Sequence, residues 1–212
     1  EAYTGVNSAR IDLPGVRTDA VVQSTEPLVA RGEGGALAPV NTALRPTPGG
    51  WKPENTTAPT LIREGLADGF ELGEGASKLS IRPRGLSAQG WLSGQKAIFA
   101  NAGTDLDVIA EAVPRGLSVS WAMRSPKSPE VVSFDLQAPA GTVAREQGGR
   151  VVLLRGSVVI GEVESPAAFD AQGSPVAVSY EVDGLTLHVR TAHKSKDLAY
   201  PIAVDPVWNY SG

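Results

Sequence analysis

The two histidines, His188 and His193, are the only imidazole side chains that a catalytic triad could use in this chain. A Ser-His-Asp hydrolase needs one of them beside a serine hydroxyl and a carboxylate. His188 falls on the polar side of an alternating segment, and His193 lies in the charged run Ala-His-Lys-Ser-Lys-Asp. Both positions are typical of solvated surface residues, and no Gly-x-Ser-x-Gly motif is present. Because triads also assemble from residues far apart in sequence, a hydrolase stays open as the least favoured function.

Asp105 and Asp107 are a second candidate, in the run that begins Asn101-Ala-Gly-Thr. Two residues apart on a strand, these carboxylates would project from one face, about 6–7 Å apart. Such a pair can bind Ca²⁺ with the help of carbonyl oxygens, or flank a glycosidic bond. The spacing departs from the EF-hand pattern, which also requires a glutamate at its twelfth position. A turn followed by the polar face of a strand explains the same residues, so we assign no metal-binding, cofactor-binding or catalytic residue.

The four tryptophans could provide a surface on which sugar rings stack. Trp121 belongs to an alternating apolar stripe, which predicts that it is buried. Trp51, Trp91 and Trp208 lie in segments without a clear period and could be exposed. A large aromatic ring beneath a loop usually packs against the core. Carbohydrate binding is therefore an alternative function and not the leading one.

Composition limits the classes of protein that this chain can belong to. Its 24 Gly and 16 Pro among 212 residues favour many short strands joined by tight turns. The net charge is −4 without a basic cluster, which argues against nucleic acid and anionic membranes as partners. The absence of Cys excludes disulfides and thiolate metal sites. No stretch reaches the ~20 apolar residues of a membrane span, so we expect no membrane insertion.

Alternating apolar residues predict the strands that must position these side chains. The strongest signal covers residues 176–191, where alternation on both sides of Asp183-Gly184 predicts a hairpin with a type I′ turn. Three further segments alternate like half-buried strands, and two continuous apolar runs suggest a hairpin buried on both faces. The half-buried strands are expected at 106–110, 117–123 and 132–136, and the buried hairpin at 151–154 and 158–160.

The first half of the chain is rich in Pro and Gly. Because proline removes a ladder donor, residues 39–60 should be irregular or form an edge strand. The predicted fold is all-β: an antiparallel β-sandwich, with a large multi-strand supersandwich as its extreme form. We divide the chain into an N-terminal arm or first strand (1–22), an irregular β-rich half (23–95) and a sandwich half (96–212). The last two segments are expected to form one continuous domain.

Three motifs carry a resemblance to a known kind of module. They are AIFANAGTDLDV at 97–108, SPAAFDAQG at 165–173 and YPIAVDPV at 200–207, and the segment GGALAPVNTAL at 34–44 adds a fourth likeness. Together they resemble the β-rich module that precedes YD-repeat (RHS-like) or wall-associated repeats in large secreted bacterial proteins. The likeness spans about residues 27–207. It departs at 102–104, where the family more often has Pro-Gly-Val.

The resemblance implies a non-enzymatic structural or interaction domain that acts as a cap or spacer. It implies an extracellular or cell-surface location, a signal sequence outside this chain, and continuation into repeats after Trp208. Pro201 and the Asp205-Pro206 pair would bracket a final strand and force an extended exit. The expected partners are the downstream repeats of the same polypeptide, with other proteins or glycans as further ones, and the isolated domain is expected to be a monomer.

Overall fold

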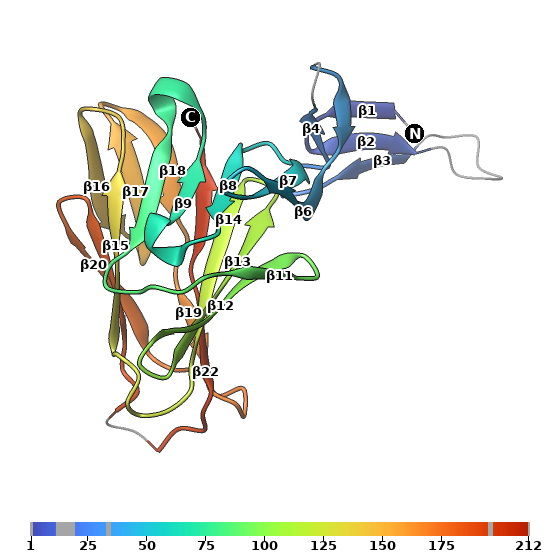
Figure 1. Ribbon diagram of the computed structural model, residues 1–212. Helices are drawn as coiled ribbons and strands as arrows, with labels where there is room; N and C mark the ends of the chain where they lie inside the picture. Colours follow the sequence, from blue (N-terminus) through green and yellow to red (C-terminus); the bar gives the residue numbers. More distant parts are fainter. Residues whose placement is uncertain (1, 12–19, 33–34, 195–196, 212) are drawn as a thin grey trace.

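The computed structural model describes residues 2–11, 20–32, 35–194 and 197–211 as a chain of antiparallel strands (Figure 1). Two large sheets pack face to face, so the predicted all-β sandwich is confirmed. One sheet has eight strands, in the order β20 (Val178–Asp183), β21 (Thr186–Thr191), β15 (Val131–Gln137), β10 (Leu79–Pro83), β9 (Phe70–Leu72), β8 (Thr60–Arg63), β7 (Gly50–Asn55) and β6 (Asn41–Thr47).

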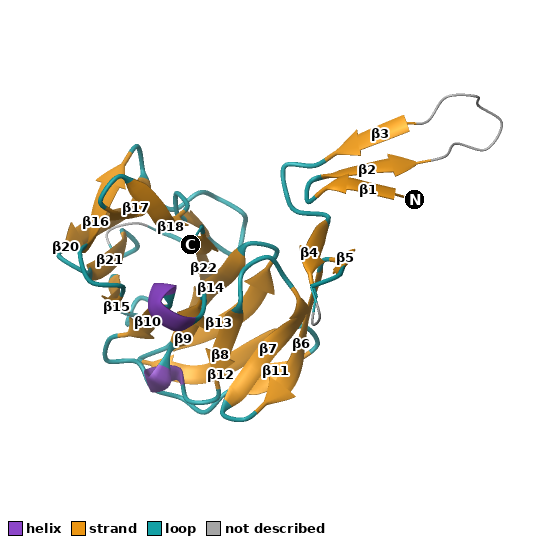
Figure 2. Ribbon diagram, turned by 90° about the horizontal axis from the view of Figure 1, so that it is seen from above, coloured by secondary structure: helices purple, strands orange, loops and turns teal. Residues whose placement is uncertain are grey.

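The second sheet has ten strands (Figure 2). Its main path is β11 (Trp91–Ser93), β12 (Lys96–Gly103), β13 (Leu106–Val113), β14 (Gly116–Met123), β23 (Val207–Tyr210), β18 (Val158–Val163), β17 (Arg150–Arg155) and β16 (Thr142–Gln147). Two more strands, β22 (Ile202–Asp205) and β19 (Ala167–Phe169), continue from the other half of β14. Two 3₁₀ turns, η1 (Leu66–Asp68) and η2 (Gly75–Ser77), flank β9.

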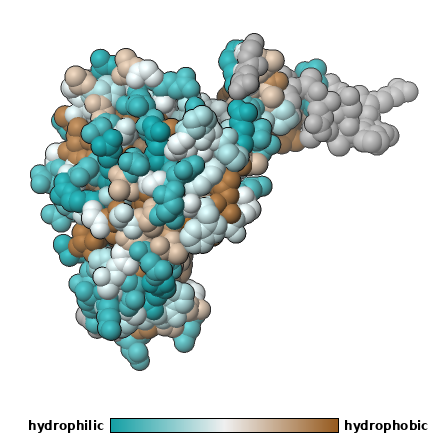
Figure 3. Space-filling view, viewed as in Figure 1, coloured by the Kyte–Doolittle hydropathy of each residue, from teal (hydrophilic) through white to brown (hydrophobic). Residues whose placement is uncertain are grey.

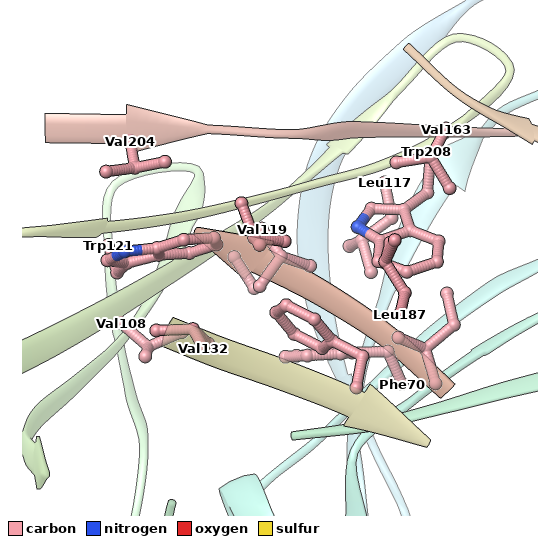
Figure 4. Packing of buried hydrophobic residues seen from close by; sticks show 14 of the residues in the cluster. Phe70, Val108, Leu117, Val119, Trp121, Val132, Val163, Leu187, Val204 and Trp208 are labelled. Carbon is pink, nitrogen blue, oxygen red and sulfur yellow. The ribbon is translucent and has the colours of Figure 1, made fainter. Parts of the chain in front are cut away.

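Aromatic side chains from both sheets meet in the core. Phe134 of the eight-stranded sheet lies 5.5 Å from Trp208 and 6.0 Å from Trp121 of the ten-stranded sheet, measured between ring centroids. Near the other edge, Phe99 contacts Trp51 and Phe70 at 6.4 Å each. Figure 4 shows Trp121 and Trp208 among the aliphatic side chains of both sheets. Such dense apolar packing is the main source of stability in a sandwich.

Alternation predicted the central strands well. Along β13, buried and half-buried residues alternate at every position, and β15 follows the same rule up to its last residue. The predicted hairpin of β17 and β18 also forms, but its burial was predicted wrongly in part. Val158 is 60% exposed and Val159 39% exposed, because they follow directly on the turn at Gly156 and Ser157.

The hairpin of β20 and β21 is confirmed, but its predicted turn type is wrong. Asp183 pairs with Thr186, so the two turn residues are Gly184 and Leu185 instead of Asp183 and Gly184. Only Gly184 has a positive φ, of 59°, which is the arrangement of a type II′ turn. The Leu185 carbonyl accepts a hydrogen bond from the backbone N–H of Leu136, which ties the turn to β15.

The proline-rich segment 39–60 is more regular than predicted. Its first strand, β6, is indeed an edge strand, but β7 lies inside the sheet between β6 and β8. Trp51 of β7 is only 7% exposed, and its packing against Phe99 holds the strand in place. The turn between the two strands consists of Pro48 and Gly49, which suit a tight turn because Gly49 has a φ of 79°.

The chain does not leave the sheet at Asp205-Pro206, as the predicted extended exit required. Strands β22 and β23 both pair with β14, before and after Pro206, and β23 also pairs with β18. Asp205 Oδ1 accepts a hydrogen bond of 2.7 Å from Ser118 Oγ, which fixes the junction. Pro206 therefore divides one long edge of β14 between two short strands.

The N-terminal strands stand apart from the sandwich (Figures 1 and 2). Strands β1 (Ala2–Gly5), β2 (Ser8–Ile11) and β3 (Ala20–Gln23) form a separate sheet, and a two-stranded hairpin of β4 (Val29–Arg31) and β5 (Leu37–Pro39) follows. Pro14-Gly15, part of the predicted arm, lies outside the described residues. Asn55 Nδ2 donates to the carbonyls of Ala38 and Pro39 and so attaches the hairpin to β7. Across the described ranges, no helix has the length and apolar character needed to cross a membrane.

Candidate functional site

Asp105 lies at the tip of the turn between β12 and β13. Gly103 pairs with Leu106, so Thr104 and Asp105 form the turn, and Asp105 has a φ of 48°. Its carboxylate accepts a hydrogen bond of 2.5 Å from Ser125 Oγ, and its carbonyl accepts one of 2.7 Å from Ser128 Oγ. Asp105 thus joins this turn to the loop that follows β14.

Asp107 has different partners. Its Oδ1 accepts a hydrogen bond of 2.7 Å from the backbone N–H of Asn101 and lies 3.3 Å from Arg124 Nη1. Arg124 Nη2 also donates to Asn101 Oδ1 at 2.6 Å, which closes a small polar ring. Each carboxylate is therefore engaged by its own protein donors. Among the described residues, no group of three or more His, Cys, Asp or Glu side chains is arranged to hold a metal ion.

His193 is buried, and its predicted place on the surface is wrong. The side chain is 1% exposed, and its Nδ1 lies 2.6 Å from Tyr200 Oη. The charged neighbours in sequence suggested solvent, but Tyr200 packs edge-on against the imidazole with a centroid distance of 5.9 Å. No local pattern reveals this contact, because Tyr200 lies seven residues further along the chain.

The surroundings of His193 favour the neutral imidazole. Burial lowers the pKa of His193, the carboxylate of Glu130 opposes that shift, and Lys194 adds to it. The Ser128 backbone also opposes the shift, and Nε2 is buried without a hydrogen-bond partner. A nucleophilic serine would have to bond to this nitrogen, so the arrangement at His193 is that of a buried structural histidine.

His188 lies on the outer face of the eight-stranded sheet and is half-buried. Its Nδ1 is 2.8 Å from Ser133 Oγ on β15, and Glu181 of β20 stands directly opposite it on the other side. Serine, histidine and a carboxylate therefore share one row, as a triad would require. The row lies on an open sheet face, where the backbone amides of the inner strands β15 and β21, which carry Ser133 and His188, are used in the ladder and cannot form an oxyanion hole. The three residues form no assembled catalytic site.

Asp170 is a structural residue that sequence reasoning missed. Its Oδ1 accepts hydrogen bonds from the backbone N–H groups of Ser174 (2.8 Å) and Gln172 (2.9 Å), and its Oδ2 accepts one from Ala199 (3.2 Å). The Ser174 bond is the main cause that lowers the pKa of Asp170, and burial opposes it. The run Asp-Ala-Gln-Gly-Ser is an aspartate turn signal that could have identified this role.

One pocket lies on the outer face of β6 to β9 and has a volume of about 380 Å³. Glu71 on its floor contacts Arg63 at 2.6 Å and Lys78 at 3.3 Å. Although burial raises the pKa of Glu71, the hydrogen bonds from these two cations outweigh it and lower the pKa. A second hollow, of about 640 Å³, separates the edge strands β16 and β20. Neither hollow contains a residue predicted as a site.

Of the four tryptophans, Trp91 alone is accessible. Trp51, Trp121 and Trp208 are at most 7% exposed, whereas Trp91 is 48% exposed on the edge strand β11. The expectation that Trp51 and Trp208 could be exposed is therefore wrong, because both fill the interior between the sheets. The face seen in Figure 3 mixes hydrophilic and hydrophobic residues.

Comparisons with known proteins found no relative of this chain. No protein-family model matches the chain, and neither a curated protein nor a solved structure matches it. An assignment of function therefore rests on the residues of this chain and on the geometry described above.

Proposed function

We propose that the chain is a non-enzymatic structural and interaction domain of a large exported bacterial surface protein of the YD-repeat type. In this role it acts as a cap or spacer before downstream repeats. One observation carries the proposal: each of the three motifs that resemble this family contains a polar residue that is bound by protein partners and links parts of the sandwich.

Each motif contributes such a residue. Asp107, in the first motif, is bound by Asn101 and Arg124. Asp170, in the second motif, ties three backbone N–H groups together. Tyr200 and Asp205, in the third motif, bond to His193 and Ser118. Motifs made of architectural residues suit a module whose task is to be rigid, and this agreement supports a scaffold role.

The complete open reading frame of the gene tests the proposal. We expect a signal peptide upstream and YD repeats downstream of this segment. We also expect a protein that spans this domain and the first repeats to unfold at a higher temperature than the isolated domain, because docking buries surface. A gene without repeats, or a tandem protein with no gain in stability, would contradict the scaffold role.

Carbohydrate binding is a second proposed function for the same domain. It is favoured by the position of Trp91, which is 48% exposed on an outer sheet face. The other three tryptophans are all buried. Tryptophan is enriched at binding surfaces, where its apolar ring can stack and its N–H can donate a hydrogen bond. This function is compatible with a scaffold, since a surface module can hold both a repeat shell and a glycan.

A further inference from the structure

We infer that the outer face of the ten-stranded sheet is a binding surface for a neutral polysaccharide chain. The surface is a diagonal apolar strip, here called the outer strip, formed by Phe169, Ala203, Ala122, Ile109, Ile98 and Trp91. This inference rests on the second proposed function, carbohydrate binding, and names the surface and the class of ligand.

Strand register places these side chains next to one another. Trp91 stands opposite Ile98, Ile98 opposite Ile109, and Ile109 opposite Ser120. Directly opposite residues of an antiparallel pair project from the same face of the sheet. Since Phe99 and Ala97, the neighbours of Ile98, are buried in the core, this row faces outward.

A second row continues the strip toward β19. Phe169 stands opposite Ala203, Ala203 opposite Ala122, and Ala122 opposite Asp107. Along β14 and β13 the two rows are two residues apart, so Ala122 and Ile109 are diagonal neighbours on one face. The strip thus crosses six strands, and Ser120 and Asp107 flank its diagonal step from Ala122 to Ile109.

The outer strip has an aromatic side chain at each end and small side chains at its centre. Trp91 is 48% exposed and Phe169 50% exposed, whereas alanines form the floor between Ile109 and Phe169. Six strands at about 4.8 Å spacing make the strip about 24 Å long. Two exposed rings on a shallow track of this length suit an extended chain of pyranose rings, whose apolar faces stack on aromatic side chains.

The charges along the strip favour a neutral ligand. Lys96 is paired with Glu111 at 3.0 Å, and Arg124 with Asp107 at 3.3 Å, so both cations of the margins are already neutralised. The remaining carboxylate, Asp205, accepts a hydrogen bond from Ser118 and would repel an acidic polymer. The Ser120 hydroxyl stands opposite Ile109 in the outward-facing row and offers an acceptor for a sugar hydroxyl group.

The size of the strip argues against a stable protein partner. A width of about three residues, roughly 10 Å, gives an apolar area of a few hundred Å². A specific protein–protein interface needs about 800 Å² from each partner. A glycan of a few rings requires far less area, so the polysaccharide is the occupant that fits.

Affinity electrophoresis tests the inference on the full 212-residue chain. The gels contain laminarin, xyloglucan, hydroxyethylcellulose, glycogen or glucomannan as neutral probes, and alginate as an acidic one. We expect at least one neutral probe to retard the protein, and Trp91→Ala or Phe169→Ala to weaken that binding by about 10-fold or more. Val158→Ala, at a valine that is 60% exposed on β18, is the matched control and should bind like the unmodified chain. Thermal unfolding of each variant confirms that it is folded.

The possible outcomes separate the two proposals. Retardation that survives both aromatic substitutions would overturn the outer strip but leave carbohydrate binding in place. No retardation by any neutral probe would overturn both. Retardation by alginate alone would overturn the neutral ligand. Self-association in sedimentation analysis that Trp91→Ala abolishes would assign the surface to a second copy of this chain instead.

Discussion

At the scale of single residues, His193 should make the stability of the protein depend on pH. Its imidazole is 1% exposed, and Tyr200, Glu130 and Lys194 are the titratable groups that act on it. Burial lowers its pKa, whereas an unfolded chain keeps a value near 6.5. Below about pH 6.5 the unfolded state therefore binds a proton that the native state resists, and the free energy of unfolding must decline as the pH falls.

Urea unfolding at about pH 7.5 and about pH 5.5 measures this decline. We expect a lower midpoint at the acidic pH for the unmodified chain and a much smaller difference for His193→Gln. His188→Gln is the control and should retain the decline, because His193 is still present. Equal midpoints of the unmodified chain at the two pH values would show that His193 does not titrate in this way.

The hydroxyl of Tyr200 should contribute more to the free energy of unfolding than a similar hydroxyl on the surface. Tyr200→Phe leaves both nitrogens of the buried imidazole without a partner, so we expect a loss of about 1–3 kcal/mol in the free energy of unfolding. Ser133→Ala also removes a hydroxyl from an imidazole, that of His188, but water can replace it on the outer face. Its expected cost is within about 0.5 kcal/mol. Equal losses in the two variants, measured by urea unfolding, would contradict this account.

Single residues were the hardest to predict from the sequence. Trp121 was placed correctly because it belongs to a strand with a clear period. The burial of His193 and Trp208 was missed because each depends on a contact, with Tyr200 and with Phe134 respectively, that no local pattern reports. The turn signal of Asp170 was present in the sequence, but its third donor, the N–H of Ala199, lies 29 residues away.

At the scale of strands, Gly116 permits two strands to meet. A Cβ at this position would lie 1.9 Å from the Trp208 carbonyl oxygen of β23. Gly116→Ala should therefore push β14 away from β23 and cost about 3 kcal/mol, the upper end of overpacking effects. Gly32→Ala is the matched control, because its Cβ would meet nothing closer than 3.8 Å. Urea unfolding compares the two, and equal stability would contradict the close approach.

Strand prediction succeeded where one face of a strand is buried and the other is not. This condition holds for β13, for β15 and for the second half of β14, whose alternation reports their position directly. It fails for β7, whose Pro53 argued against an inner strand, and for β23, which follows a proline that was read as the end of the fold. Which strands pair across the sandwich has no local signal, so the order of the two sheets could not be predicted.

At the scale of the whole molecule, the N-terminal sheet should be dispensable for the sandwich. The core cluster begins at Trp51, and the N-terminal sheet is tied to the chain beyond it through hydrogen bonds of Val6 with Leu28 and Val29. All four tryptophans lie at or after residue 51, so their fluorescence reports only on the sandwich. Deletion of residues 1–24 should change its free energy of unfolding by no more than about 0.5 kcal/mol. A clear fall in the urea midpoint would show that the N-terminal sheet supports the core.

The position of β23 also affects when the molecule can fold. This strand lies in the middle of the ten-stranded sheet, between β14 and β18, although its residues follow those of every other strand in the sequence. A nascent chain emerging from the ribosome therefore lacks a central element of its sheet until residues 207–210 are free. Contacts between such distant segments form slowly. The ten-stranded sheet therefore closes late, and we expect the polypeptide to stay incompletely folded until its last strand is available.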